Sequence, residues 1–173
     1  KNMYVIVDGK RNDIGNTMKA YAAAYLGETK LDDENFETAF GADALTVNGY
    51  LGTDCIDPLI NVCNKLDNGI FVLAKTSNPS SGELQDKFID GVAVYELMGK
   101  MCEDWGKQIT GRYGYSGVGA VVGATYPHQL SSLRNSLSHT FFLVPGYGAQ
   151  GGSGHDVAGA FDSEGLGAIV NSS

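Results

Sequence analysis

Two carboxylates and two cations stand close together in VDGKRNDIGNT, residues 7–17, which begins at the end of an apolar run. If the run is an extended strand, Asp8 and Lys10 lie on one face, because side chains repeat every two residues. A lysine between carboxylates stays protonated, because nearby opposite charge favours the charged form. Held by Asp8 and Asp13, such a lysine suits a reaction in which a carbanion must be protonated. The alternative is a surface ion-pair cluster in which Asp13 caps a helix that starts at Ile14.

A second stretch of chemical interest is the glycine-rich LVPGYGAQGGSG, residues 143–154, which also begins in an apolar run. Backbone amides in such a loop can bind a phosphate group, and Gln150 can donate a further hydrogen bond to it. The stretch is not a P-loop, because it lacks GK followed by Ser or Thr, and it contains no GxGxxG that opens a helix. A flexible glycine-rich connection is the alternative interpretation.

Histidine and cysteine give no catalytic or metal-binding motif. The histidines form neither an HExxH sequence nor a triad pattern, and the odd number of cysteines with no CxxC pair indicates reduced cytosolic thiols rather than a zinc site. No flavin, nicotinamide or metal motif is present, so we expect no cofactor and no metal. The histidines are His128, His139 and His155, and the cysteines are Cys55, Cys63 and Cys102.

The composition narrows the class of protein. The chain has 173 residues, of which 43% are hydrophobic and 18% charged, which is enough for one globular domain with a core. Its net charge of −8 argues against a general nucleic-acid surface. No apolar run reaches the roughly 18 residues of a transmembrane helix, so no membrane span is expected, and no signal peptide is visible.

Six short apolar runs predict the strands that position the candidate site residues. Apolar and polar residues do not alternate cleanly in these runs, which is typical of strands buried on both faces of a parallel sheet. The runs cover 4–8, 44–48, 70–76, 119–125, 140–146 and 167–173. Between them, four segments have helical character, so the chain is predicted to consist of βα units. These segments are 14–26, 54–66, 83–105 and 127–137.

Each predicted strand ends in polar or special residues, among them Asp8, Asn48, Thr76-Ser77-Asn78 and Thr125. The carboxyl ends of the strands carry the active site in a (β/α)8 TIM barrel and the ligand site in an open α/β sheet, so the pattern favours an enzyme in either fold. We interpret the six runs as strands three to eight of a barrel. Residues 1–173 would then be a single domain that lacks the first two strands and the last helix. An open sheet is the alternative.

The sequence DGKRNDIGNT resembles the DxKxxDIxNT signature of the orotidine 5′-phosphate decarboxylase family. The sequences LTVNGYLG, FVLAKTSNP, GAVVGAT, LVPGYGAQGG and GAIVNSS resemble, in order, later motifs of its longer bacterial and protozoan branch. The resemblance covers essentially the whole chain. It implies a cytoplasmic (β/α)8-barrel homodimer of de novo pyrimidine biosynthesis. Such an enzyme converts orotidine 5′-phosphate to UMP without cofactor or metal.

Matched motif by motif, the resemblance implies three catalytic residues. Lys10 corresponds to the lysine that protonates C6 of the pyrimidine, and Asp8 to the carboxylate set near the substrate's carboxylate. Asp13 corresponds to an aspartate that reaches across the dimer interface into the partner's site. Loss of CO2 leaves a carbanion whose lone pair is orthogonal to the ring π system, so electrostatics and proton delivery must stabilise it.

The resemblance also implies five substrate-binding residues. Ile14 and Thr17 lie beside Asp13 in the shared motif. Ser77 corresponds to the hydroxyl residue that contacts the pyrimidine edge. Pro145 lies at the base of the phosphate loop, and Gln150 corresponds to its phosphate-binding glutamine.

Three groups of the family pattern have no counterpart here: a second lysine on the preceding strand, an arginine after the final strand, and a ribose-contacting aspartate on the first strand. We therefore expect the natural protein to be longer at both ends and these residues alone to be inactive. Two other functions stay open. One is a metal-dependent decarboxylase or aldolase of sugar phosphates with the same fold, and the other is a non-catalytic barrel that binds nucleotides or serves as a dimer scaffold.

Overall fold

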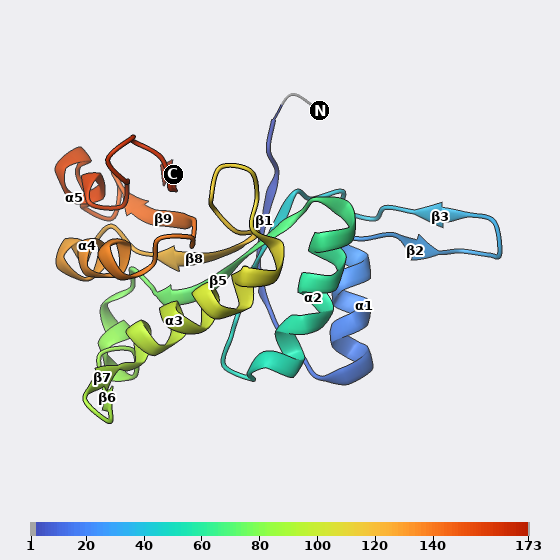
Figure 1. The fold of residues 1–173 in the computed structure, drawn as a ribbon, viewed down its shortest axis with the longest axis horizontal. Helices are drawn as coiled ribbons and strands as arrows, with labels where there is room; N and C mark the ends of the chain where they lie inside the picture. Colours follow the sequence, from blue (N-terminus) through green and yellow to red (C-terminus); the bar gives the residue numbers. More distant parts are fainter. Residues whose placement is uncertain (1–2, 173) are drawn as a thin grey trace. The chain divides into compact units, whose positions relative to one another are not determined.

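The computed structural model describes residues 3–172 of an α/β protein (Figure 1). The chain forms two compact units, residues 1–72 and 73–173, and strand β5 (Gly69–Lys75) crosses the boundary between them. The main sheet has the strand order β1-β4-β5-β8-β9-β10, and each described pairing between neighbouring strands is parallel. Parallel order with helical crossovers is the arrangement that the buried apolar runs predict.

The first unit contains β1 (Ile6–Arg11) and β4 (Ala44–Val47), which pair with each other, and β4 also pairs with the start of β5. All four residues of β4 are buried. Helices α1 (Gly15–Tyr25) and α2 (Thr53–Leu66) pack against one another. A short antiparallel hairpin, β2 (Thr29–Lys30) and β3 (Phe36–Glu37), extends away from the two helices in Figure 1.

The buried face of α2 follows directly from its sequence. Its apolar residues recur at helical spacing and are nearly inaccessible to solvent, so they form one stripe towards the core. The helix carries Asp54 in its first turn and Lys65 in its last, which suits the helix dipole. It ends at Asp67 in the left-handed conformation. The buried residues of the stripe are Cys55, Ile56, Leu59, Ile60 and Cys63.

The second unit contains β8 (Val118–Val122), β9 (Phe142–Tyr147) and β10 (Ala168–Ser172), which follow β5 in the strand order. Helix α3 (Val94–Gly106) packs on β8, while α4 (Pro127–Ser136) and α5 (Gly154–Ala158) contact one another. Two 3₁₀ helices and a second hairpin complete the unit. These are η1 (Pro79–Glu83), η2 (Lys107–Ile109), β6 (Phe88–Ile89) and β7 (Val92–Ala93).

All six predicted strands are confirmed, with ends that shift by a few residues. Ser173, the last residue of the sixth run, lies outside the described residues. The helices predicted over 14–26, 54–66 and 127–137 are confirmed as α1, α2 and α4.

The helix predicted over 83–105 is wrong in its first half, where the chain instead forms the end of η1 and the β6–β7 hairpin. The cause is the Asp90-Gly91 pair, whose φ angles are +51° and +83°. Two consecutive residues with positive φ form the type I′ turn of a two-residue hairpin, which a helix cannot accommodate. Helix α3 therefore begins only at Val94.

Candidate functional site

The first group of site residues lies in the first unit, at the carboxyl end of β1. The ammonium Nζ of Lys10 donates to both carboxylate oxygens of Asp8, at 2.6 Å each. Thr46 of β4 donates from Oγ1 to Asp8 Oδ1 at 2.8 Å and accepts from the Lys10 backbone N–H at 3.0 Å. The hydroxyl of Thr46 thus connects the carboxylate to the backbone of the lysine, and the sequence-predicted pairing of Asp8 with Lys10 is confirmed.

The backbone at Lys10, two residues beyond the predicted strand of 4–8, is not extended. Its φ is +48°, in the left-handed region that residues with a Cβ rarely adopt, and the β1–β4 register shifts between Val7 and Arg11. Backbone strain of this kind concentrates at functional sites and costs on the order of 1 kcal/mol or more. The surrounding pairing with β4 must therefore hold Lys10 in place.

The ion pair is accessible to solvent, with 51% of the Lys10 side chain and 67% of the Asp8 side chain exposed. Exposed pairs stabilise folded proteins little, so fold stability does not account for this arrangement. The hydrogen bond from Lys10 lowers the pKa of Asp8, which keeps the carboxylate ionised at neutral pH. The site therefore presents a fixed negative charge next to an exposed proton donor.

Asp13, Ile14 and Thr17 follow this pair at the start of α1. Asp13 Oδ1 accepts from the Ile14 backbone N–H at 2.8 Å, and no ion pair joins Asp13 to Lys10 within residues 3–172. The N-cap of α1 is Ile14, and no side chain caps the helix, so Asp13 is not the helix cap that the alternative interpretation as a surface ion-pair cluster requires. Ile14 and Thr17 are exposed, Ile14 by 63%.

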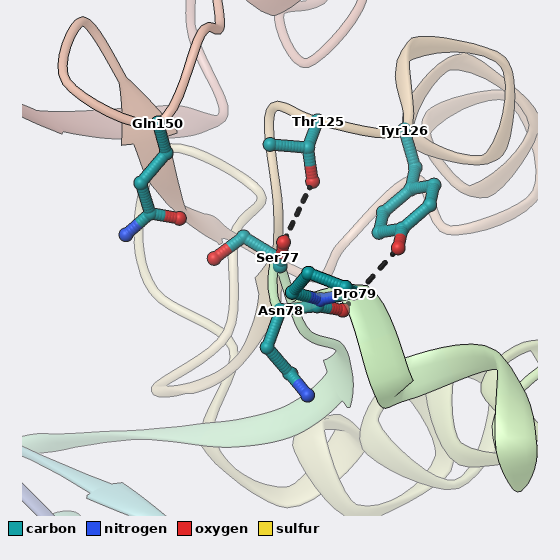
Figure 2. A pocket seen from close by; sticks show the side chains of 6 residues that line it. All are labelled: Ser77, Asn78, Pro79, Thr125, Tyr126 and Gln150. Carbon is teal, nitrogen blue, oxygen red and sulfur yellow. Dashed lines mark hydrogen bonds between the residues drawn. The ribbon is translucent and has the colours of Figure 1, made fainter.

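The second group lies in the second unit, around a pocket of about 590 Å³ (Figure 2). The pocket is formed by the segments that follow β5, β8 and β9. Thr125 Oγ1 donates to the Ser77 carbonyl at 3.1 Å, and the Tyr126 hydroxyl donates to the Asn78 carbonyl at 3.3 Å. The lining residues are Ser77, Asn78, Pro79, Thr125, Tyr126 and Gln150.

Ser77 and Gln150 both lie next to Gly146, on the side where a Cβ would project. The φ of Gly146 is +95°, which requires glycine. A Cβ at Gly146 would lie 3.2 Å from Ser77 Cβ and 3.4 Å from Gln150 Oε1. In Figure 2 the Ser77 hydroxyl points towards the Gln150 side chain. The second unit therefore brings two of the sequence-predicted site residues together. Pro145 lies behind them in β9, where its carbonyl accepts from the Ala124 N–H at 2.8 Å.

The glycine-rich segment is an ordered turn. The N–H of Gly148 donates to the Gly152 carbonyl at 2.8 Å, and the N–H of Gly152 donates to the Gly146 carbonyl at 3.0 Å. Within the described part of the chain, the N–H groups of Ala149 and Gln150 have no acceptor. A fixed turn with two available amides is able to bind an anion, which favours the phosphate interpretation over a flexible connection.

The sequence reasoning did not identify five pocket or site residues as functional: Thr46, Asn78, Pro79, Thr125 and Tyr126. Thr46 lies inside an apolar run and is 2% exposed, so its pattern indicates only a buried strand. Thr125 marked the end of a predicted strand, which was a signal for its place in the pocket. Tyr126, directly after it, carried no comparable signal.

Residues 3–172 contain neither a metal-binding cluster nor a membrane-spanning helix. No cluster of three or more His, Cys, Asp or Glu side chains in that range could hold a metal ion. None of the helices in that range is long and apolar enough to cross a membrane. The three cysteines are free and buried, and burial raises the pKa of Cys63 to about 12.

Comparison with known proteins gives consistent matches over the whole chain. The model of the orotidine 5′-phosphate decarboxylase / HUMPS family matches residues 1–169. The orotidine 5′-phosphate decarboxylase of Rhodopirellula baltica is 52% identical over 171 residues, which are 99% of this chain and 55% of the relative. That of Caldicellulosiruptor bescii is 47% identical over 173 residues, 100% of this chain and 56% of the relative.

A solved structure of Leishmania donovani OMP decarboxylase superimposes with a TM-score of 0.79 at 32% identity. The match covers 98% of this chain and 58% of that chain. This chain therefore spans about half the length of the curated relatives that it matches.

Proposed function

Since the chain belongs to the orotidine 5′-phosphate decarboxylase / HUMPS family, we propose that its two groups of site residues serve the decarboxylation of orotidine 5′-phosphate to UMP. The observation that carries the proposal is the bonded set of Asp8, Lys10 and Thr46 at the carboxyl end of β1. It places a protonated amine and an ionised carboxylate where α/β folds bind their ligands.

The chemistry assigned to this set is protonation of a carbanion. The bond between C6 and the carboxylate carbon breaks, CO2 leaves, and the electron pair remains on C6. Lys10 Nζ then transfers a proton to C6 and becomes a neutral amine, which solvent reprotonates. Asp8, whose pKa is lowered by the hydrogen bond from Lys10, lies as a carboxylate beside the substrate's carboxylate and disfavours the charged ground state relative to the transition state.

Substrate binding is assigned to the residues around the second group. Ser77 contacts the pyrimidine edge, and Gln150 binds the phosphate together with the N–H groups of Ala149 and Gln150. Pro145 supports the base of this loop. Binding energy from a phosphate remote from C6 can be used to orient the base, which lowers the barrier of the chemical step.

The same proposal covers the assembly. The six parallel strands correspond to strands three to eight of a single (β/α)8 barrel, and the enzyme is a cytoplasmic homodimer that needs no cofactor or metal. Asp13, with Ile14 and Thr17 beside it, acts in the site of the partner subunit. The absence of an Asp13–Lys10 ion pair within the described residues is compatible with this arrangement.

The test follows the ultraviolet absorbance of orotidine 5′-phosphate after addition of the protein at its full natural length, with the Lys10→Ala variant in parallel. We expect rapid loss of substrate absorbance with the wild type and a reduction of kcat by at least about a thousandfold in the variant. Addition of a chelator should leave the rate unchanged. A folded wild-type protein without turnover would contradict the proposal, and a rate abolished by the chelator would support the metal-dependent sugar-phosphate alternative.

A further inference from the structure

The last residue of β5, Lys75, is a lysine with no solvent-accessible side-chain surface. Its Nζ donates to Asp86 Oδ1 at 2.7 Å and to Ser81 Oγ at 3.1 Å. The ammonium also lies 4.1 Å from the centroid of the Tyr126 ring, a cation–π distance. A buried charge persists only where several partners compensate its lost hydration, so these contacts must be maintained together.

The partners of Lys75 connect it to the wall of the pocket. Ser81 Oγ, which accepts from the ammonium, donates to the Tyr126 hydroxyl at 3.3 Å. The same hydroxyl donates to the carbonyl of Asn78 at 3.3 Å. Both Tyr126 and Asn78 line the pocket, while Lys75 and Ser81 do not. The buried ammonium therefore contacts one lining residue, Tyr126, directly, and Tyr126 is in turn bonded to Asn78.

The position of Ser77 depends on the same segment. A Cβ at Gly123 would lie 2.9 Å from the backbone N, Cα and Cβ of Ser77, so the serine packs tightly over β8. Before it in the sequence, the Thr76 N–H donates to Gln85 Oε1 at 2.9 Å, and Gln85 Nε2 donates back to Thr76 Oγ1 at 2.8 Å. Residues 76–86 thus fold back on themselves around the Lys75–Asp86 pair.

We propose that Lys75 is a positioning residue for recognition of the pyrimidine base. Its ammonium fixes Ser81 and Tyr126, and through them the Ser77–Asn78 side of the pocket, before a ligand binds. The phosphate side, which Gln150 and the turn of residues 146–152 form, has its own hydrogen bonds and does not depend on Lys75. This assignment rests on the proposed function, because it takes the pocket to hold a pyrimidine nucleotide.

The test compares two ligands that share a phosphate and a ribose but differ in the base. Dissociation constants for UMP and for ribose 5-phosphate are measured by calorimetry on the wild type and on Lys75→Met, both at full natural length. We expect Lys75→Met to weaken UMP binding about tenfold or more, as loss of a base-contacting hydrogen bond does, and to change ribose 5-phosphate binding less than about twofold.

The matched control is Lys107→Met. Lys107 also forms an ion pair, with Asp104 in the same unit, but 71% of its side chain is exposed. This variant should bind both ligands as the wild type does. Ser81→Ala provides a second test if Lys75→Met does not fold, because it removes the hydroxyl that links the Lys75 ammonium to the Tyr126 hydroxyl without removing a pocket residue. It should also weaken UMP binding selectively.

The outcomes separate this inference from the proposed function. A wild type that binds UMP no better than ribose 5-phosphate overturns the proposed function, and the inference with it, before any variant is measured. If the wild type prefers UMP, an unchanged preference in folded Lys75→Met and Ser81→Ala overturns the inference alone. Equal weakening of both ligands also overturns it, because that result indicates general loss of structure.

Discussion

Thr46 is the residue whose single hydroxyl connects the Asp8 carboxylate to the backbone of Lys10. It donates to Asp8 and accepts from the backbone of Lys10, and its side chain is buried. Thr46→Val keeps the shape of the side chain and removes both hydrogen bonds. Loss of a hydrogen bond to a charged group corresponds to about 1.5–3 kcal/mol, so we expect kcat/KM for orotidine 5′-phosphate to fall about 10- to 100-fold.

The control for Thr46→Val is Thr29→Val, on the exposed hairpin of the same unit. Steady-state kinetics should show no change for this variant. Wild-type kinetics in folded Thr46→Val would indicate that the Asp8–Lys10 pair positions itself without β4.

The charge of Asp8 also predicts a pH dependence of stability. The hydrogen bond from Lys10 lowers the pKa of this carboxyl in the folded state below its value in the unfolded chain. Its contribution to the free energy of unfolding is therefore present at neutral pH and is lost as the pH falls through the lowered pKa.

Denaturant unfolding of the wild type and Asp8→Asn checks this sign. The difference in unfolding free energy between them should be larger at about pH 7 than at about pH 2, and small throughout because the pair is exposed. A difference that grows on acidification would contradict the assigned direction.

Among the elements, the glycine-rich turn is held in place by Gly146 at the end of β9. Gly146→Ala combines strain at φ +95° with a Cβ that intrudes between Ser77 and Gln150. We expect binding of both UMP and ribose 5-phosphate to weaken by about tenfold or more, because Ser77, the proposed base contact, must move away from the Cβ and the turn that carries Gln150, the proposed phosphate contact, is strained.

Gly165→Ala is the matched control for this variant, because its φ of +74° imposes similar strain while no atom lies within 4 Å of the added Cβ. Calorimetry should show unchanged ligand binding in Gly165→Ala despite a lower melting temperature. Equal losses of affinity in both variants would mean that backbone strain alone, rather than the intruding Cβ, weakens binding.

The elements also show how far the sequence predicts this fold. Continuous apolar runs identified all six strands. Burial on both faces explains the runs of β4, β5, β8 and most of β9, whereas no residue of β1 or β10 is buried. The apolar residues over 83–105 have helical spacing, which predicted a helix where the chain forms a hairpin. The feature that indicates the hairpin is the Asp90-Gly91 pair between two short apolar stretches. In this segment the turn residues determined the local structure more strongly than the helical periodicity of the apolar residues did.

The site was predictable only where its residues are neighbours in the sequence. Asp8 and Lys10 belong to one short motif, so their contact could be anticipated. Thr46 reaches this motif only because β4 pairs with β1 in the register observed. Lys75 contacts Tyr126, which lies 51 positions later in the sequence. Such contacts depend on strand pairing and loop packing, which no local pattern specifies.

At the scale of the whole molecule, the proposed homodimer predicts a role for the exposed apolar residues of the first unit. Ile14, next to Asp13, is 63% exposed, and Tyr50 and Leu51 after β4 are 77% and 46% exposed. Ile14→Glu should convert the dimer to monomers in light scattering and abolish decarboxylation, since Asp13 then reaches no partner site.

Leu31→Glu is the control, because Leu31 is 59% exposed in the loop between β2 and β3 of the same unit. It should remain dimeric and active. A fully active monomer of Ile14→Glu would contradict the sharing of Asp13 between subunits.

The reactivity of the buried cysteines towards an alkylating reagent reports whether each of the two units is folded. Cys55 and Cys63 lie in the first unit and Cys102 in the second, all of them buried as free thiols. Because burial raises the pKa of Cys63 to about 12, this thiol carries no reactive charge in the native state. Alkylation at about pH 8, followed by peptide mass spectrometry, should label these residues only after denaturation. Labelling of the native protein would indicate local opening of α2 or α3.

At Lys10 the residue that would be best for stability differs from the residue that the proposed reaction needs, because the backbone is left-handed there. Glycine adopts a φ of +48° without steric penalty, so Lys10→Gly should melt at a higher temperature than Lys10→Ala, and selection for stability alone would replace the lysine. In the proposed reaction Lys10 supplies the amine that protonates C6, so its retention would carry the cost of a less favourable backbone. Engineering for heat resistance that follows folding energy alone would therefore select against the residue that we propose as the proton donor.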